Sequence, residues 1–107
     1  MAAPVDRDLA VQKVRQYVRR LRENNVAIWQ VYLFGSYANG APDADSDIDL
    51  VVPLDRDEVD IFDEGVRLTR LRRGIDLRIE PRAFGRKDWE DQGPMVRKIV
   101  RTGQRIV

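Results

Sequence analysis

Histidine and cysteine are both missing from the 107 residues of this chain. Without cysteine there can be no disulfide bonds and no thiolate metal sites. Without histidine there can be no imidazole bases, no Ser-His or Cys-His catalytic pairs and no histidine metal ligands. Any catalysis must therefore use carboxylates, hydroxyl groups, basic side chains and bound metal ions.

Long hydrophobic runs and an excess of one charge are also missing. The longest apolar run, Leu50 to Leu54, is about five residues long, whereas a membrane span needs roughly 20. Residues 1–8 carry acidic side chains and show no secretory signal. The 19 basic and 18 acidic residues leave a net charge of +1, which gives no general attraction to nucleic acid. We therefore expect a cytoplasmic protein with no membrane partner.

Apolar residues recur at regular spacing along the chain, which is typical of one small folded domain covering residues 1–107. The order of expected elements predicts an α+β fold in which helices back a small mixed three-stranded sheet. Ile61, Phe62, Val66 and Leu68 are expected to point inward from the second helix. The expected elements are a helix over 8–23, strands over 27–34 and 48–53, a helix from Asp57 or Asp60 to about Arg73, a strand over 75–80, and a helix from Pro94 to Gly103.

Two aspartates occupy alternate positions at the start of the second strand. Asp47 and Asp49 are two residues apart, so their carboxylates project from the same face, while Ile48 and Leu50 point to the core. Adjacent carboxylates repel each other, which makes it unfavourable to hold them together. A divalent cation bound between them removes this repulsion. Ligands that are all oxygen favour Mg²⁺, Mn²⁺ or Ca²⁺.

Asp76 is the third acidic candidate, between Ile75 and Leu77 on the third expected strand. If this strand is a neighbour of the strand over 48–53, the Asp76 carboxylate can reach the same place. Three converging carboxylates can hold two metal ions, which stabilise the attacking and leaving oxygens of an in-line phosphoryl displacement.

Gly35 and Ser36 follow the first expected strand directly. Glycine allows a phosphate to approach the backbone, and the free N–H groups at the start of a helical turn bind anions. The serine hydroxyl adds a donor. This turn is therefore a candidate phosphate-binding site.

Each of these features is ordinary by itself, because Asp-x-Asp is common on solvated strand edges and Gly-Ser is common in turns. A calcium loop is excluded, since its sixth position would be Ile48 in place of glycine and its twelfth would be Leu54 in place of glutamate. Only the combination of the glycine turn with the acidic strand indicates a specific chemistry.

That combination resembles the signature of the DNA polymerase β-type nucleotidyltransferase superfamily. Gly35-Ser36 is followed by ten residues, then by Asp47-Ile48-Asp49, and later by Ile75-Asp76-Leu77. The resemblance covers about residues 27–81, and the short chain is similar to the minimal nucleotidyltransferases. It implies the nucleotidyltransferase fold, an ATP substrate and two Mg²⁺ ions.

The resemblance also implies roles for individual residues. Asp47 and Asp49 would bind both metal ions, Asp76 would bind the catalytic metal and help to deprotonate the acceptor, and Gly35 with Ser36 would hold the terminal phosphates. Minimal members often have arginine where this chain has Asn39, which cannot supply the same charge. The candidate substitutes near the third expected strand are Arg72, Arg73, Arg78 and Arg82.

Minimal nucleotidyltransferases commonly occur as antitoxins beside helical HEPN-type ribonuclease toxins. The resemblance therefore implies a partner of that kind, with a tyrosine of the toxin as the acceptor of AMP, in a homo- or hetero-oligomer. Two alternatives stay open. The chain could neutralise a partner by occlusion without catalysis, or it could modify a small hydroxylated molecule such as an antibiotic.

Overall fold

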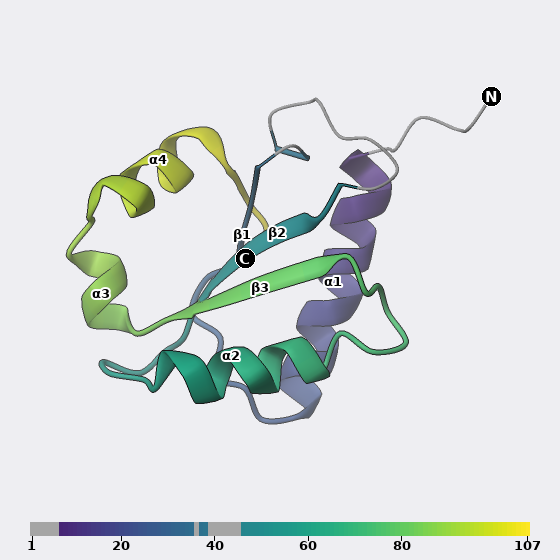
Figure 1. Cartoon of the computed structure of the whole chain (residues 1–107), viewed down its shortest axis with the longest axis horizontal. Coiled ribbons are helices and arrows are strands. Elements are labelled where there is room, and N and C mark those ends of the chain that lie inside the picture. The colour runs from purple at the N-terminus through teal and green to yellow at the C-terminus, as the bar shows by residue number, and fades with distance from the viewer. Residues whose placement is uncertain (1–6, 36, 39–45) are drawn as a thin grey trace.

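The computed structural model describes residues 7–35, 37–38 and 46–107 (Figure 1). Within these ranges, four helices and four strands follow one another in the order helix, two strands, helix, strand, two helices, strand. Their bounds are α1 Arg7–Glu23, β1 Tyr32–Phe34, β2 Ile48–Pro53, α2 Ile61–Arg70, β3 Ile79–Phe84, α3 Arg86–Glu90, α4 Pro94–Thr102 and β4 Gln104–Arg105.

The strands form one mixed sheet in the order β3-β2-β1-β4. β1 is antiparallel to both β2 and β4, whereas β2 and β3 are parallel and are connected through α2. The expected mixed α+β architecture is confirmed. The expected number of three strands is wrong for the described residues, because the two-residue strand β4 adds a fourth.

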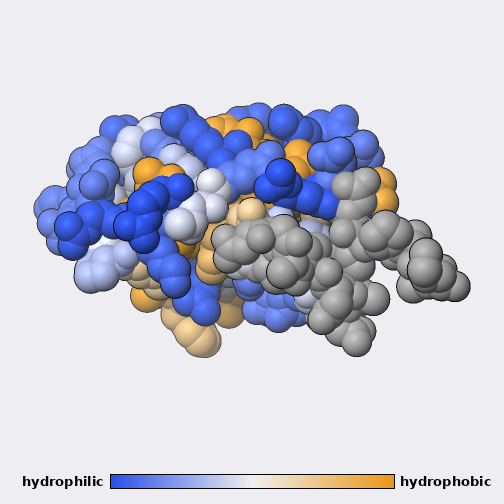
Figure 2. Space-filling model, turned by 90° about the horizontal axis from the view of Figure 1, so that it is seen from above, coloured by the Kyte–Doolittle hydropathy of each residue, from blue (hydrophilic) through white to orange (hydrophobic). Residues whose placement is uncertain are grey.

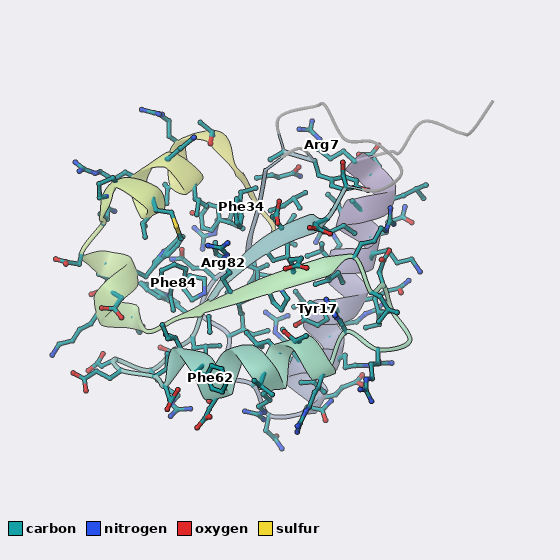
Figure 3. The ribbon with its side chains drawn as sticks, viewed as in Figure 1. Arg7, Tyr17, Phe34, Phe62, Arg82 and Phe84 are labelled. Atoms are coloured by element: carbon teal, nitrogen blue, oxygen red, sulfur yellow. The ribbon has the colours of Figure 1, made fainter. Side chains whose placement is uncertain are left out.

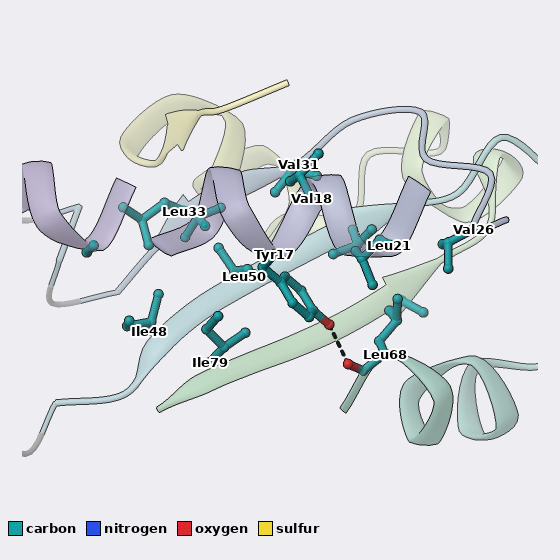
Figure 4. Close-up of a cluster of buried hydrophobic side chains, with 14 of the residues drawn as sticks. Tyr17, Val18, Leu21, Val26, Val31, Leu33, Ile48, Leu50, Leu68 and Ile79 are labelled. Atoms are coloured by element: carbon teal, nitrogen blue, oxygen red, sulfur yellow. Dashed lines mark hydrogen bonds between the residues drawn. The ribbon is translucent and has the colours of Figure 1, made fainter. Parts of the chain in front are cut away.

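One face of the sheet packs against α1 and contains the larger apolar core (Figures 1 and 4). Leu33, Leu50 and Ile79 project from three strands into this core, and Tyr17 and Leu21 project into it from α1. Alternation along each strand leaves the opposite face for other side chains. Acidic residues of the strands can therefore gather on the face away from α1.

The opposite face is covered at one end by α3 and α4. Trp89 of α3 is buried there, with its ring centroid 5.6 Å from Tyr32 and 5.5 Å from Phe84. Val96 and Ile99 of α4 complete this smaller core. The sheet face beyond these helices, at the start of β2 and β3, is the part left for a functional site.

The third strand begins later than the sequence pattern predicts. The structure places β3 at residues 79–84, so the expected strand over 75–80 is wrong except at its end. Alternating apolar and polar residues continue through both segments, so the pattern alone does not show where the strand begins. Pro81 is tolerated because β3 is an edge strand and its missing N–H breaks no ladder.

Helix α2 begins where expected, because the Asp60 carboxylate accepts hydrogen bonds from two backbone N–H groups of its first turn. Only Leu68 of the four expected inward residues is buried. Ile61, Phe62 and Val66 expose 62%, 76% and 37% of their surface, so that part of the prediction is wrong. The helix packs along the outer edge of β3, which gives its apolar stripe no sheet face to cover (Figure 1).

Most of the surface is hydrophilic on the face that Figure 2 shows, with separate hydrophobic areas. None of the helices in the described ranges is long and apolar enough to cross a membrane.

Candidate active site

The sheet register places two acidic residues side by side on the face away from α1. Asp49 of β2 lies opposite Phe34 of β1 on one side and opposite Glu80 of β3 on the other. Asp47 precedes β2 by one residue and is two residues from Asp49. The acids are thus at the end of the sheet where β1 finishes and β2 and β3 begin.

The Asp49 carboxylate is in an environment that disfavours its charge. Partial burial raises its pKa, and the neighbouring charges of Asp47 and Glu80 raise the pKa further. The Arg82 guanidinium has the opposite, smaller effect. Repulsion among these three carboxylates is the condition that a bound divalent cation relieves.

Gly35 lies directly against the Asp49 carboxylate. Its backbone has a φ of 75°, and a β-carbon at this position would be 2.4 Å from Asp49 Oδ2. A residue with a side chain would therefore strain the backbone and displace the carboxylate. The glycine is needed for Asp49 as well as for the expected approach of a phosphate.

Asp76, the third expected ligand, is not on a strand, and the charges that act on the Asp49 carboxylate are those of Asp47, Glu80 and Arg82. It lies in the turn before β3, where its Oδ1 accepts the backbone N–H of Arg78. Arg78 also donates from Nε to Oδ1 at 3.0 Å and from Nη2 to Oδ2 at 2.7 Å. These bonds hold the pKa of Asp76 below its usual range, despite the opposing effect of burial.

Arg78 connects this turn to the segment after Gly35. Its Nη1 donates to the Tyr37 hydroxyl at 2.9 Å, and the Tyr37 ring is fully buried in the larger core. Asp76 thus orients an arginine that contacts the residue next to the expected phosphate turn. Asp76 is thus linked through Arg78 to the segment that follows Gly35.

Oxygen ligands from Asp47, Asp49 and Glu80 suit Mg²⁺ in their chemistry. Within residues 7–35, 37–38 and 46–107, no three acidic side chains are gathered closely enough to form a ready metal-binding group. The mutual repulsion at Asp49 agrees with carboxylates that stay apart without a cation. The residue types fit Mg²⁺, and the cation would supply the attraction that draws them together.

Ser36 and Asn39 lie outside the described residues. Of the four candidate substitutes for the family arginine, Arg78 is bound to Asp76 and Arg72 donates to the Ile79 carbonyl. Arg73 is exposed in the turn after α2. Arg82 is the candidate on β3 whose charge acts on Asp49.

A hollow of about 410 Å³ lies next to the acidic face. Its lining includes Arg82 and Phe84 of β3, Ile61 of α2 and Met95 of α4. A larger hollow of about 570 Å³ lies between α2 and Asn24 and contains none of the acids discussed above. Asp47, Asp49 and Glu80 do not line the smaller hollow either, but its lining includes Arg82, whose charge acts on Asp49. The smaller hollow is therefore the relevant one.

Glu80 is a candidate that the sequence pattern alone does not single out. In the expected strand over 75–80 it is an ordinary polar end residue, and Asp76 is the acid that the pattern indicates. The signal for Glu80 is its place in a second alternating run, Ile79 to Phe84.

Comparison with known proteins agrees with this geometry. The model of the nucleotidyltransferase domain family matches residues 11–101, which include the acidic face and the glycine turn. The chain belongs to the nucleotidyltransferase domain family. The expected class of activity, nucleotidyl transfer, is confirmed at the level of the family. No curated protein matches the chain significantly.

Solved structures share the fold of this nucleotidyltransferase. A Sulfolobus solfataricus protein assigned as a nucleotidyltransferase has a TM-score of 0.63 and 21% identity, over 79% of this chain and 75% of that one. A mutant of the toxin–antitoxin complex MntA–HpeT has a TM-score of 0.59 and 22% identity, over 85% and 68% of the two chains. A toxin–antitoxin structure with AMP-PNP has a TM-score of 0.56 and 20% identity, over 91% and 72%.

Proposed function

We propose that this nucleotidyltransferase uses Mg²⁺ to transfer AMP from ATP to a hydroxyl group of a partner protein, a tyrosine of a HEPN-type toxin. The observation that carries the transfer chemistry is the pairing of Asp49 with Glu80 on one sheet face, with Asp47 two residues before Asp49 and Gly35 against the Asp49 carboxylate. Two of the structural neighbours are toxin–antitoxin complexes and one was determined with AMP-PNP, which supports this partner class and substrate. The proposal includes the cytoplasmic location and the single domain over 1–107.

In this reaction the acceptor oxygen forms a bond to the α-phosphorus of ATP, and the bond from that phosphorus to the bridging oxygen breaks. Pyrophosphate leaves with the electron pair, and the hydroxyl proton passes to a carboxylate. Mg²⁺ bound at this face would neutralise charge on the attacking and leaving oxygens. The protein supplies positioning and fixed charge, which are the main needs of phosphoryl transfer.

Asp47 and Asp49 would hold the metal ions, and Gly35 with Ser36 would hold the terminal phosphates. Asp76 stays the third acid of the family-based prediction, but its bidentate bonding to Arg78 leaves it poorly placed for that role. We propose Glu80 instead, because it lies opposite Asp49 on the neighbouring strand. Its carboxylate would take the acceptor proton.

The exposed stripe of α2 gives some support to the alternative of neutralisation by occlusion. Ile61 and Phe62 together present apolar surface that a partner could cover. Such binding would not require the acidic face. Catalytic and occluding mechanisms therefore differ in their response to substitution of Asp49.

The test is to incubate the protein with Mg²⁺, α-labelled ATP and the product of the neighbouring gene. Wild-type protein should label the partner, and the variant Asp49→Asn should not. Asp91→Asn is the matched control, since Asp91 is an exposed acid at the end of α3. An unlabelled partner that is still bound and inhibited would refute transfer and favour occlusion. Label on added small hydroxylated compounds without any partner would instead identify a small-molecule transferase.

A further inference from the structure

Arg82 projects from β3 on the same face as the acids. It follows Glu80 by two residues and lies opposite Val51, which itself follows Asp49 by two. Residues two apart on a strand share a face and are separated by roughly 7 Å, and neighbouring strands are about 4.8 Å apart. Arg82 is therefore the next residue along the sheet from the pair formed by Asp49 and Glu80.

Within the part of the chain that the structure describes, the Arg82 side chain has no fixed partner. Among the described residues it makes no hydrogen bond or ion pair, although it is exposed beside carboxylates. Two other arginines near the sheet are engaged, since Arg78 is bound to Asp76 and Arg86 is bound to Asp55 and Glu90. Arg82 thus keeps its donors for a ligand.

The surroundings of Arg82 leave room for that ligand. Figure 3 shows the residue between Phe34 and Phe84, and its side chain forms part of the wall of the 410 Å³ hollow. An anion that approaches the acidic face from this hollow would meet the guanidinium. Paired donors of a guanidinium match the geometry of phosphate oxygens.

The position along the sheet selects one phosphate of the nucleotide. Gly35 is at the β1 side of Asp49, and Arg82 is on β3 at the other side. If the terminal phosphates occupy the turn at Gly35, the triphosphate extends across β2 toward β3. The phosphate nearest to β3 is then the reacting one.

We propose that Arg82 binds the α-phosphate of the nucleotide, a role that rests on the nucleotidyl transfer proposed above. The guanidinium holds the non-bridging oxygens of that phosphate while the metal-binding carboxylates face it from β2. It neutralises charge at the reacting phosphorus and compensates for the uncharged Asn39 of the family motif.

Equilibrium binding of AMP and of ATP in the presence of Mg²⁺ tests this role. Arg82→Ala should weaken binding of both nucleotides by about 10- to 100-fold, because a contact with the α-phosphate is common to both. Arg82→Lys should be intermediate, since lysine keeps the charge and loses the paired donors. Arg19→Ala is the matched control on α1, on the other side of the sheet, and should bind like wild type.

Binding of Mn²⁺ without nucleotide separates this role from damage to the acidic site. Removal of a positive charge should leave Mn²⁺ affinity unchanged or increase it, whereas a disrupted site would lose it. Loss of Mn²⁺ affinity, unchanged nucleotide affinity, or weaker ATP binding with unchanged AMP binding would each overturn the proposal. A wild-type protein that binds no nucleotide would refute the proposed function itself.

Discussion

Glu80 and Asp76 compete for the role of third carboxylate, and their surroundings differ. Glu80 is exposed on β3 opposite Asp49, whereas Asp76 is bound through three hydrogen bonds to Arg78. We expect Glu80→Gln to lower kcat on the order of 100-fold, as for the loss of a general base. Asp76→Asn should keep most of the activity. The reverse ranking in steady-state kinetics would restore Asp76 as the carboxylate that takes the acceptor proton.

The Asp76–Arg78 pair also predicts a pH dependence of stability. The folded-state pKa of Asp76 lies below its ordinary value of about 3.9, so the pair stabilises the fold above that pH. This contribution is lost as the pH falls through the folded pKa. The difference in urea unfolding between wild type and Asp76→Asn should therefore be largest at pH 7 and should shrink as the pH falls below about 3.9. A difference that does not change as the pH is lowered would contradict this interpretation.

Gly35 combines a left-handed backbone with contact to a functional carboxylate. Gly35→Ala should cost roughly 1–3 kcal/mol of stability because of the positive φ. It should also reduce Mn²⁺ affinity, because the added β-carbon displaces Asp49 Oδ2. Gly93→Ala is a suitable control, since a β-carbon there would meet no atom within 4 Å. Unchanged metal affinity in Gly35→Ala would argue against Asp49 as a ligand.

At the scale of elements, α1 holds the segment that leads to β3. The buried Tyr17 hydroxyl donates to the Leu68 carbonyl of α2, as Figure 4 shows, and Lys13 donates to the Ile75 carbonyl. Arg20 donates to the Arg73 carbonyl in the same connection. Two basic residues of α1, Lys13 and Arg20, thus hold the connection between α2 and β3, which leads to the acidic face.

Tyr17→Phe should lower the free energy of unfolding by about 1–3 kcal/mol, because the Leu68 carbonyl would lose its buried donor. Tyr32→Phe is the comparison, since the Tyr32 hydroxyl makes no hydrogen bond to the described residues. Denaturant unfolding should show a clearly larger effect for Tyr17. Equal effects would mean that the hydroxyl of Tyr17 contributes little.

Local signals predicted most elements, and tertiary context determined the remainder. Hydrophobic periodicity located α1, and Asp60 and Pro94 marked the starts of α2 and α4. The predicted start of β3 is wrong because two alternating segments, 75–80 and 79–84, follow each other without a break. The sequence also does not show that β3 is an edge strand, where Pro81 is tolerated. The same shift places Glu80 opposite Asp49 and makes it the residue that we propose as third acid in place of Asp76. The pairing of Asp47 with Asp49 needed only strand alternation, so it could be predicted.

Whole-molecule properties were less accessible from the sequence. The family resemblance to nucleotidyltransferases is confirmed by the match over residues 11–101. The exposed apolar stripe of α2 could not be foreseen, because periodicity indicates an amphipathic helix without showing what covers it. The sequence also does not show that Arg82, among the described residues, makes no hydrogen bond or ion pair. Only the structure shows which arginines have partners.

The central claim is that one acidic face, formed by Asp47, Asp49 and Glu80, binds the metal–nucleotide complex. Titration of a non-hydrolysable ATP analogue with Mn²⁺ into wild type, Asp49→Asn and Glu80→Gln tests it without any acceptor. We expect metal-dependent binding by wild type that is lost in Asp49→Asn and strongly reduced in Glu80→Gln, with Asp91→Asn unaffected. Binding by both site variants as tight as that of wild type would contradict it.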